Sequence, residues 1–315
     1  MTSYLQLLRL ILPVFALMAI GMGLRRVRWL TSEADTSLLK LVVNLLYPCI
    51  IFEHVFSNPA LREPGNLGWA PLLGFVTMAG GIALCYHVAR HLGFTVGTGL
   101  RTFAFSTGIY NYSYITVPVM LALFGEGSLG VLFTFNVGAE AAIWMVGVMV
   151  LAGQSWRQGW RQALSPPVLA LVVSVLVNLL RLDPYIPRIA LDVVHPLAAC
   201  AIPMGLVLSG ATLAEHFFGP PRELFELRTS LAAVAMRLGV LTGLFLLLAR
   251  FGPFSADIRH VILVQAAMPV GFLPLVLVKH YGGHSLTAVR IVLATVLASL
   301  LLTPLWLRLG LAWLG

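Results

Sequence analysis

The chain has 315 residues, of which 59% are hydrophobic and 10% are charged, and its mean hydropathy is +0.93. This composition lies far outside that of soluble globular domains and excludes a soluble enzyme. The net charge is +8, but the basic residues sit in short segments between apolar runs. Such charges set membrane topology, whereas nucleic-acid binding would need a basic stripe with interleaved aromatic residues.

A bilayer crossing needs about 20 mostly apolar residues, and the chain holds ten runs of that kind. The predicted spans are residues 5–24, 38–57, 68–89, 100–124, 128–152, 166–182, 190–214, 229–250, 258–280 and 286–309. The first run is expected to be a retained helix and not a signal peptide, because its basic cluster (Arg25, Arg26 and Arg28) follows the apolar stretch.

Lys and Arg residues are distributed unevenly between the two sides of this arrangement. The loops and adjoining span ends after the odd-numbered spans hold 12 of them, and those after the even-numbered spans hold 6. By the positive-inside rule, both termini are predicted to face away from the cytoplasm, in a cell (inner or plasma) membrane.

Three landmarks recur in order at about half the chain length. Their offsets are 154, 155 and 157 residues, and the pairs are Pro13–Leu17 with Pro167–Leu171, Pro48 with Pro203, and Gly125–Leu129 with Gly282–Leu286. The chain is therefore predicted to be a duplication, with residues 1–152 as one five-helix repeat and residues 153–315 as the second. An odd number of spans per repeat inverts the second copy, and inverted repeats are typical of secondary transporters that work by alternating access.

Two predicted spans contain residues that suit a binding site better than a lipid-facing surface. The fourth span includes the polar stretch Ser106–Pro118, and the ninth includes Gln265–Pro274, which holds two prolines. Proline frees backbone carbonyls, and the positive N-terminal end of the half-helix after each break favours an anion such as a carboxylate. The expected substrate-binding residues are Asn111, Tyr112, Ser113, Thr116, Pro118, Asn136, Gln265, Pro269, Val270, Gly271 and Pro274.

Glu140 is an acid in the middle of the fifth span. Acids at this depth are costly unless they are protonated, paired or hydrated, so they are functional hypotheses. Two interpretations stand side by side: Glu140 carries a coupling proton, or it forms a structural pair with a span residue such as Arg237.

The stretches Asn111–Pro118 and Leu123–Glu126 resemble the fourth-helix motif of the auxin efflux carrier family, and Gln265–Pro269 with Tyr281 and Gly282 resembles its ninth-helix motif. Pro48 and Ala201–Pro203 extend the resemblance over nearly the whole chain. It implies an all-helical crossover fold like that of bile-acid symporters and sodium/proton antiporters. Helices 1, 2, 6 and 7 would form a scaffold, helices 3, 4, 5, 8, 9 and 10 a transport core, and helices 4 and 9 would be broken where they cross.

The resemblance also implies the class of substrate and the assembly. Family members move organic anions, which are auxin in plants and malonate or malate in some bacteria, and the fold makes a homodimer an expectation. This chain departs from the family motifs at three positions. Leu273 stands where the family often has Asn, and Ser113 and Thr116 stand where the family motif has Gly. The polar lining therefore differs, and the substrate does not follow from the family.

Other functions receive less support from the sequence. A sodium/proton exchanger would ordinarily use a mid-span aspartate, but Asp35, Asp183, Asp192 and Asp257 all lie outside spans or at their ends. A non-transporting receptor would leave the paired broken helices unexplained. The chain has no CxxC, metal-ligand spacing, nucleophile elbow or phosphate loop, so we expect no enzyme activity, cofactor or metal. The expected partners are the lipid bilayer, the organic anion, and a proton or sodium as coupling ion.

Overall fold

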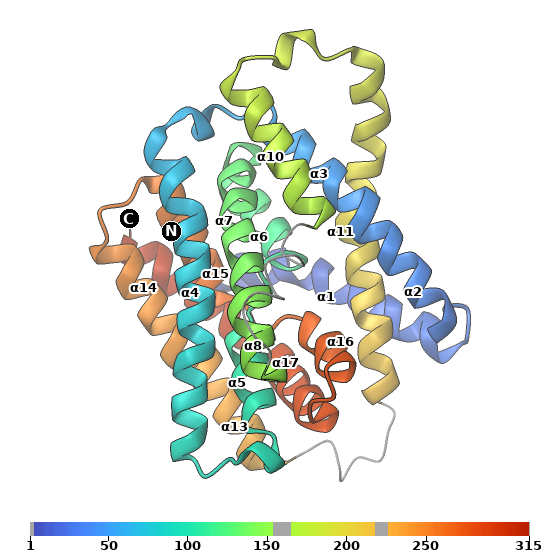
Figure 1. Ribbon diagram of the computed structural model, residues 1–315, viewed down its shortest axis with the longest axis vertical. Coiled ribbons are helices and arrows are strands. Elements are labelled where there is room, and N and C mark those ends of the chain that lie inside the picture. The colour runs from blue at the N-terminus through green and yellow to red at the C-terminus, as the bar shows by residue number, and fades with distance from the viewer. Residues whose placement is uncertain (1–2, 154–164, 218–225, 315) are drawn as a thin grey trace.

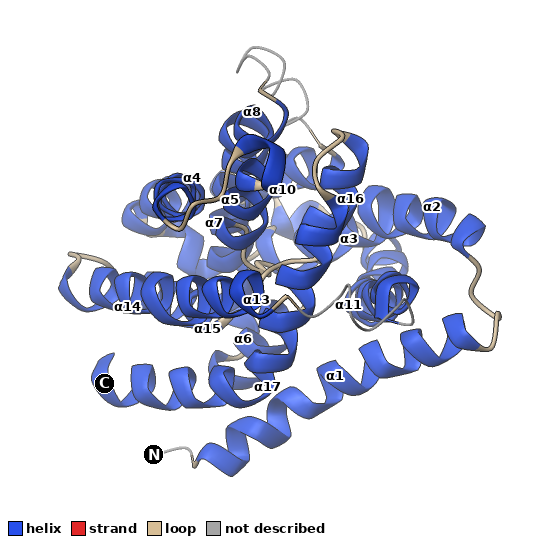
Figure 2. Cartoon of the chain, turned by 90° about the horizontal axis from the view of Figure 1, so that it is seen from below, coloured by secondary structure: helices blue, strands red, loops and turns tan. Residues whose placement is uncertain are grey.

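The computed structural model of the protein describes residues 3–153, 165–217 and 226–314. These ranges are helical apart from turns, connections and one isolated bridge, as Figure 2 shows. Seven helices in them are long and apolar enough to cross a membrane, so the chain is an integral membrane protein. Four of the seven are single helices: α1 (Tyr4–Arg26), α4 (Pro64–His91), α11 (Arg188–Phe217) and α17 (Ser285–Leu314).

The other three long helices each contain one π-helical segment. The segments are η1 (Val42–Leu46) between α2 (Ser32–Leu41) and α3 (Tyr47–Val55), η5 (Ile143–Gly147) between α7 (Leu129–Ala142) and α8 (Val148–Ala152), and η7 (Met236–Leu241) between α13 (Leu227–Ala235) and α14 (Thr242–Phe251). The first has a local cause, because Pro48 lacks an N–H and its ring would clash with the carbonyl of Asn44 in a regular α-helix. Single π turns are frequent at functional sites.

One predicted span is shorter in the structure than expected, and the two spans that were expected to be broken are each divided into two helices. The run at 166–182 forms α10 (Pro166–Leu179), a helix of only 14 residues. The run at 100–124 is divided into α5 (Leu100–Gly108) and α6 (Thr116–Phe124), and the run at 258–280 into α15 (Ala256–Ala267) and α16 (Leu273–His280). In the described connections lie four short 3-10 turns: η2 (Pro59–Arg62), η3 (Val96–Thr98), η4 (Glu126–Ser128) and η6 (Asp183–Tyr185).

The helices pack in two groups. In one, α1 lies along α11, and α3 contacts both α10 and α11; in the other, α4 lies along α7, and α15 contacts α14 and α17. Figure 1 shows α3, α10 and α11 on one side of the molecule and α4 with α14 on the other, with α6 and α7 between them. The site lies where the two groups meet.

Glycines allow the closest approaches inside each group. A Cβ at Gly21 or Gly210 would overlap a backbone carbonyl across the α1–α11 contact, and one at Gly74 or Gly138 would do so across the α4–α7 contact. Small residues hold membrane helices together in this way because lipid supplies no hydrophobic drive for their association. The α1–α11 pair and the α4–α7 pair are therefore each packed backbone against backbone.

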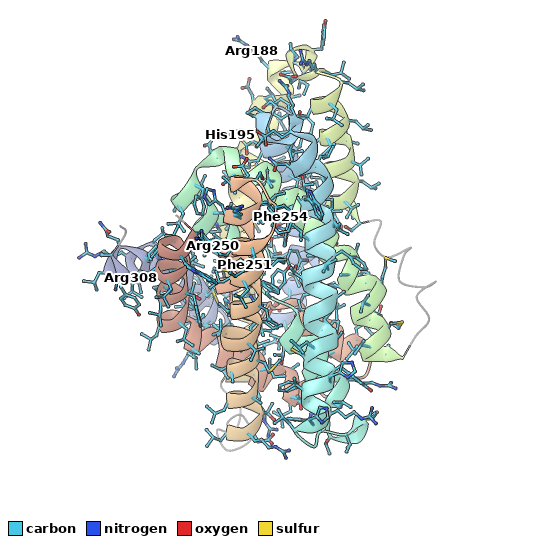
Figure 3. The ribbon with its side chains drawn as sticks, turned by 90° about the vertical axis from the view of Figure 1, so that its left-hand side faces the viewer. Arg188, His195, Arg250, Phe251, Phe254 and Arg308 are labelled. Atoms are coloured by element: carbon cyan, nitrogen blue, oxygen red, sulfur yellow. The ribbon has the colours of Figure 1, made fainter. Side chains whose placement is uncertain are left out.

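Charged and aromatic side chains mark helix ends, and apolar side chains cover the faces between them. Arg188 and His195 lie toward one end of the molecule, near the start of α11, and Arg250 and Phe251 end α14 (Figure 3). Exposed apolar residues line α10, among them Leu169 and Val173. This distribution is that of a protein surrounded by lipid.

Candidate functional site

The two divided helices meet at their breaks through a short backbone bridge between Tyr110 and Val270. The N–H of Asn111 donates to the carbonyl of Pro269 at 2.8 Å, and the N–H of Gly271 donates to the carbonyl of Ile109 at 2.9 Å. Irregular backbone at membrane depth is tolerated only where its polar groups find partners. The two breaks supply these partners to each other.

The prolines lie beside the breaks in a definite order. Pro118 is in the first turn of α6 and Pro274 in the first turn of α16, so each break lies on the N-terminal side of its proline. The sequence predicted breaks at the prolines themselves, whereas in the structure each break comes just before its proline. A first-turn proline loses no hydrogen bond, because the first N–H groups of a helix have no partner within the helix.

Side-chain hydrogen bonds fix the orientation of two amide groups at the crossing. The Oδ1 atom of Asn111 accepts from the Ile115 N–H at 3.1 Å. The Oδ1 atom of Asn136 accepts from Gln265 Nε2 at 3.0 Å, while Gln265 Oε1 accepts from the Thr116 hydroxyl at 3.4 Å. With their oxygens engaged, Asn111 and Asn136 keep their NH₂ groups as donors, and neither nitrogen has an acceptor among the described residues.

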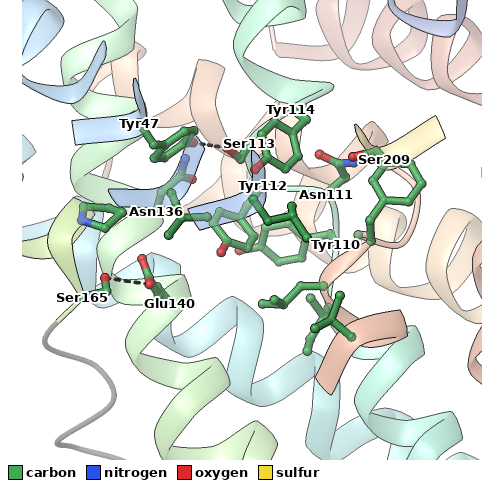
Figure 4. Close-up of a pocket in the computed structure, with 18 of the residues that line it drawn as sticks. Tyr47, Tyr110, Asn111, Tyr112, Ser113, Tyr114, Asn136, Glu140, Ser165 and Ser209 are labelled. Atoms are coloured by element: carbon green, nitrogen blue, oxygen red, sulfur yellow. Dashed lines mark hydrogen bonds between the residues drawn. The ribbon is translucent and has the colours of Figure 1, made fainter. Parts of the chain in front are cut away.

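A cavity of about 260 Å³ lies beside this crossing (Figure 4). It is below the usual size of a drug-binding pocket, which is about 300–1,000 Å³. Residues of both helix groups line it, and most of the lining is apolar or aromatic. The expected site residues that line it are Asn111, Tyr112, Ser113, Asn136, Glu140 and Gly271.

The other expected residues do not line the cavity. Thr116 and Gln265 lie behind it in the amide network, and Pro269 and Val270 form the bridge. Pro118 and Pro274 lie in helix first turns. These six residues support the site and do not reach its space.

Sequence reasoning missed several lining residues: Tyr47, Tyr110, Tyr114, Phe133, Trp144, Ser165, Ser209, Thr212 and Phe272. Two of them had a signal, since Tyr110 and Tyr114 belong to the polar stretch of the fourth span. The Tyr47 hydroxyl is hydrogen-bonded to Ser113, and a Cβ on Gly205 of α11 would overlap the Tyr114 ring. Tyr47 and Tyr114 thus contribute to the contacts between the two helix groups.

Glu140 lies at the edge of the cavity, partly exposed to it. The Ser165 hydroxyl, directly before α10, donates to Glu140 Oε1 at 2.9 Å. The positive end of the α10 dipole lies beside this carboxyl group. The structural pair of Glu140 with Arg237 is not formed, because Arg237 is engaged elsewhere.

Arg237 is fully buried in η7 and holds the C-terminal end of α15. Its Nε donates to the carbonyl of Met268 at 2.8 Å, and its Nη2 donates to the carbonyls of Gln265 at 2.5 Å and Ala266 at 3.2 Å. The guanidinium also lies 5.0 Å from the centre of the Tyr110 ring. A fixed positive charge therefore meets the negative end of this half-helix, and it uses carbonyls of the kind that hold sodium in other transporters.

Within the described ranges, no three His, Cys, Asp or Glu side chains cluster in a way that could hold a metal ion.

Comparison with known proteins also divides the chain into two halves. The family model described as "Membrane transport protein" matches residues 7–158 and again residues 154–307. An uncharacterized transporter of Methanothermobacter thermautotrophicus is 25% identical over 312 residues, covering 94% of this chain and 96% of that protein.

Proposed function

We propose that this chain, which belongs to the membrane transport protein family of the auxin efflux carriers, moves a small organic anion across the membrane by alternating access. Membership makes it a transporter. The class of substrate, the mechanism and the coupling ion are proposals that rest on the geometry of the site.

The observation that carries the proposal is the pair of amide donors at the cavity. Asn111 and Asn136 are 3% and 5% exposed, and their NH₂ groups lack acceptors among the described residues and are enclosed by protein in this conformation. A buried donor without a partner costs about 1–3 kcal/mol, so a ligand that accepts from both, once the site rearranges to expose them, relieves that cost. A carboxylate accepts only and has two oxygens, which fits two donors. The positive ends of α6 and α16 favour the same charge.

The proposed architecture has ten spans, with α5–α6 and α15–α16 as interrupted crossing spans and α10 as a short one. Residues 1–152 and 153–315 are the two inverted repeats. The group with α1, α3, α10 and α11 is the scaffold, and the group with α4, α7 and α15 belongs to the core. Backbone-to-backbone packing of α1 on α11 and of α4 on α7 supports movement of the two groups as rigid bodies, with side-chain contacts such as Tyr47 with Ser113 exchanged between them.

The cavity is proposed to open to the cytoplasm. It is lined by Leu39 and Val43 near the start of the second span, by Ser165 near the start of the sixth, by Thr212 late in the seventh and by Val276 late in the ninth. These ends adjoin loops that carry most of the basic residues, which the positive-inside rule assigns to the cytoplasm.

We propose proton coupling through Glu140. Arg237 already occupies three carbonyls at the end of α15, so this half of the crossing offers sodium no vacant carbonyl cage. Glu140 is the acid that faces the cavity, and intramembrane acids commonly relay protons.

The test is uptake of labelled mono- and dicarboxylates into proteoliposomes under pH, sodium or potential gradients, with the native chain and Asn111→Ala. Saturable carboxylate flux that responds to the pH gradient and is lost in the variant is the expected result. Cation exchange without carboxylate flux would favour the sodium/proton exchanger, and saturable binding without any flux would favour a receptor.

A further inference from the structure

Two helices that line the cavity, α3 and α7, run past it at the end away from its proposed cytoplasmic opening. The cavity is lined near that opening by Val43 and Glu140, and farther from it by Ile51 on α3 and Phe133 on α7. Almost one turn farther along α3, the ring of His54 lies nearly parallel to that of Phe133, with ring centres 6.3 Å apart. The two groups of helices are therefore in direct contact beyond the cavity.

Asn58 joins the two groups of helices just beyond His54. It is 6% exposed, and its Nδ2 donates to the carbonyl of Gly127 in η4 at 3.0 Å and to the carbonyl of His54 at 3.1 Å. A Cβ on Gly130, in the first turn of α7, would lie 2.5 Å from this Nδ2 atom. The side chain of Asn58 thus lies directly on the backbone of α7, in space that the missing side chain of Gly130 leaves free.

The main chain at Asn58 is held by the scaffold. Asn178 of α10 donates through its Nδ2 to the carbonyls of Val55 and Asn58, both at 2.8 Å. Arg62 donates in turn to Asn178 Oδ1 at 3.3 Å. Gly127 lies in η4, which leads directly into α7 of the core. The hydrogen bond from Asn58 to Gly127 therefore runs between the two groups that the proposed function moves against each other.

We propose that Asn58 and His54 on the scaffold, with Gly127, Gly130 and Phe133 on the core, form an outer gate that shuts the cavity from the non-cytoplasmic side. This inference rests on the proposed function, which requires the cavity to open to each side in turn, and it identifies the contact that separates for the second opening. A polar contact suits this task, because a hydrogen bond that is exchanged for bonds to water costs little net free energy.

A disulfide across the outer gate tests the inference. A Cβ on Gly130 would lie 3.0 Å from the Cβ of Asn58, and disulfides join Cβ atoms that are about 3.5–4.5 Å apart, so a small shift suffices. Asn58→Cys and Gly130→Cys are combined in the full-length chain after Cys49, Cys85 and Cys200 have been replaced by Ala. Each single cysteine variant is the control, since it cannot form the bridge.

Flux is measured in proteoliposomes with labelled mono- and dicarboxylates, phenylacetate and malonate among them, after oxidation and again after reduction. The double variant should form the disulfide in the membrane, and its flux should fall by the fraction of chains that are bridged and return on reduction. The oxidised protein should bind the transported carboxylate with unchanged affinity, because the cytoplasmic opening and the lining residues are left intact. Oxidation should not change flux in the single variants.

A second readout needs no disulfide. Asn58→Cys alone places a smaller side chain in the contact, and its thiol should react slowly with a membrane-impermeant maleimide added from the non-cytoplasmic side. The reaction should become faster when a transported carboxylate is present, because the outer gate then opens in each cycle. A rate that does not change with substrate would show that this contact stays closed, and would overturn the inference.

The other results that would overturn the inference are distinct from a failure of the proposed function. Absence of the disulfide under oxidising conditions would show that Asn58 and Gly130 do not meet. A complete disulfide with undiminished flux would show that the contact is static, and loss of binding on oxidation would make it part of the binding site. Absence of saturable carboxylate flux in the native chain would instead refute the proposed function, and the outer gate with it.

Discussion

Asn111 performs two tasks with two different atoms, and a pair of substitutions separates them. Its Oδ1 accepts from the Ile115 N–H at the start of α6, and its Nδ2 is a buried donor without an acceptor among the described residues. Asn111→Asp keeps an oxygen for the Ile115 N–H but replaces the donor with a second carboxylate oxygen. Asn111→Ala removes both groups.

The magnitudes follow from these contacts. A hydrogen bond to a charged group is worth about 1.5–3 kcal/mol, and about 1.4 kcal/mol corresponds to a tenfold change in affinity. Either variant should therefore bind a carboxylate substrate at least about tenfold more weakly, and the Asp variant adds like-charge repulsion. Asn111→Ala also strands the N–H of Ile115, which is 1% exposed, at a cost of about 1–3 kcal/mol in stability.

The assay combines calorimetric affinity for the carboxylate found in the flux experiment with thermal unfolding in detergent. Asn111→Ala should lose both affinity and unfolding temperature. Asn111→Asp should lose affinity and unfold closer to the native temperature, because a carboxylate is a good acceptor at a helix N-terminus. Native affinity in the Asp variant would refute the assignment of Nδ2 as a ligand donor.

Three further predictions concern packing and coupling. Gly138→Ala places a Cβ against the carbonyl of Pro71 and should destabilise the chain by about 1–3 kcal/mol. The control Gly80→Ala, whose new Cβ meets no neighbouring atom within 4 Å, should leave stability unchanged. Equal unfolding temperatures of the two variants would contradict the close α4–α7 contact. Arg237→Gln should lower the unfolding temperature, because it leaves the carbonyls at the end of α15 without their cation. Flux through the native chain should be the same in sodium and potassium media. A requirement for sodium would show that the guanidinium group does not take the place of a sodium ion. Glu140→Gln should flatten the pH dependence of flux, and an unchanged profile would remove Glu140 from coupling.

The sequence predicted the elements whose cause is local. Span-length apolar runs identify a membrane protein, because a buried backbone in lipid must be helical, and seven of the described helices have the necessary length and composition. The polar stretch around Asn111 and the prolines from Pro269 to Pro274 marked the places where the chain leaves the helix. Pro118 and Pro274 were informative because proline is favoured in the first turn of a helix, where its missing N–H costs no hydrogen bond, and each lies directly after a break.

The sequence was silent where a contact joins distant parts of the chain. Whether Glu140 pairs with Arg237 depends on which faces of α7 and η7 point toward each other, and neither face is set by local pattern. The composition of a span alone did not reveal that α10 would be short, or that Tyr47 would reach the break in the first crossing helix.

Sequence by itself therefore determined the membrane setting, the family motifs and the two breaks, because backbone hydrogen bonding in lipid and the geometry of proline act within a few residues. Tertiary structure alone decided the chemistry of the site. It placed Glu140 beside Ser165 and Arg237 at the end of α15. It also left the NH₂ groups of two residues that line the cavity, Asn111 and Asn136, without an acceptor among the described residues. These outcomes depend on how rigid helices pack, since a side chain's partner is the group that packing brings within hydrogen-bond distance.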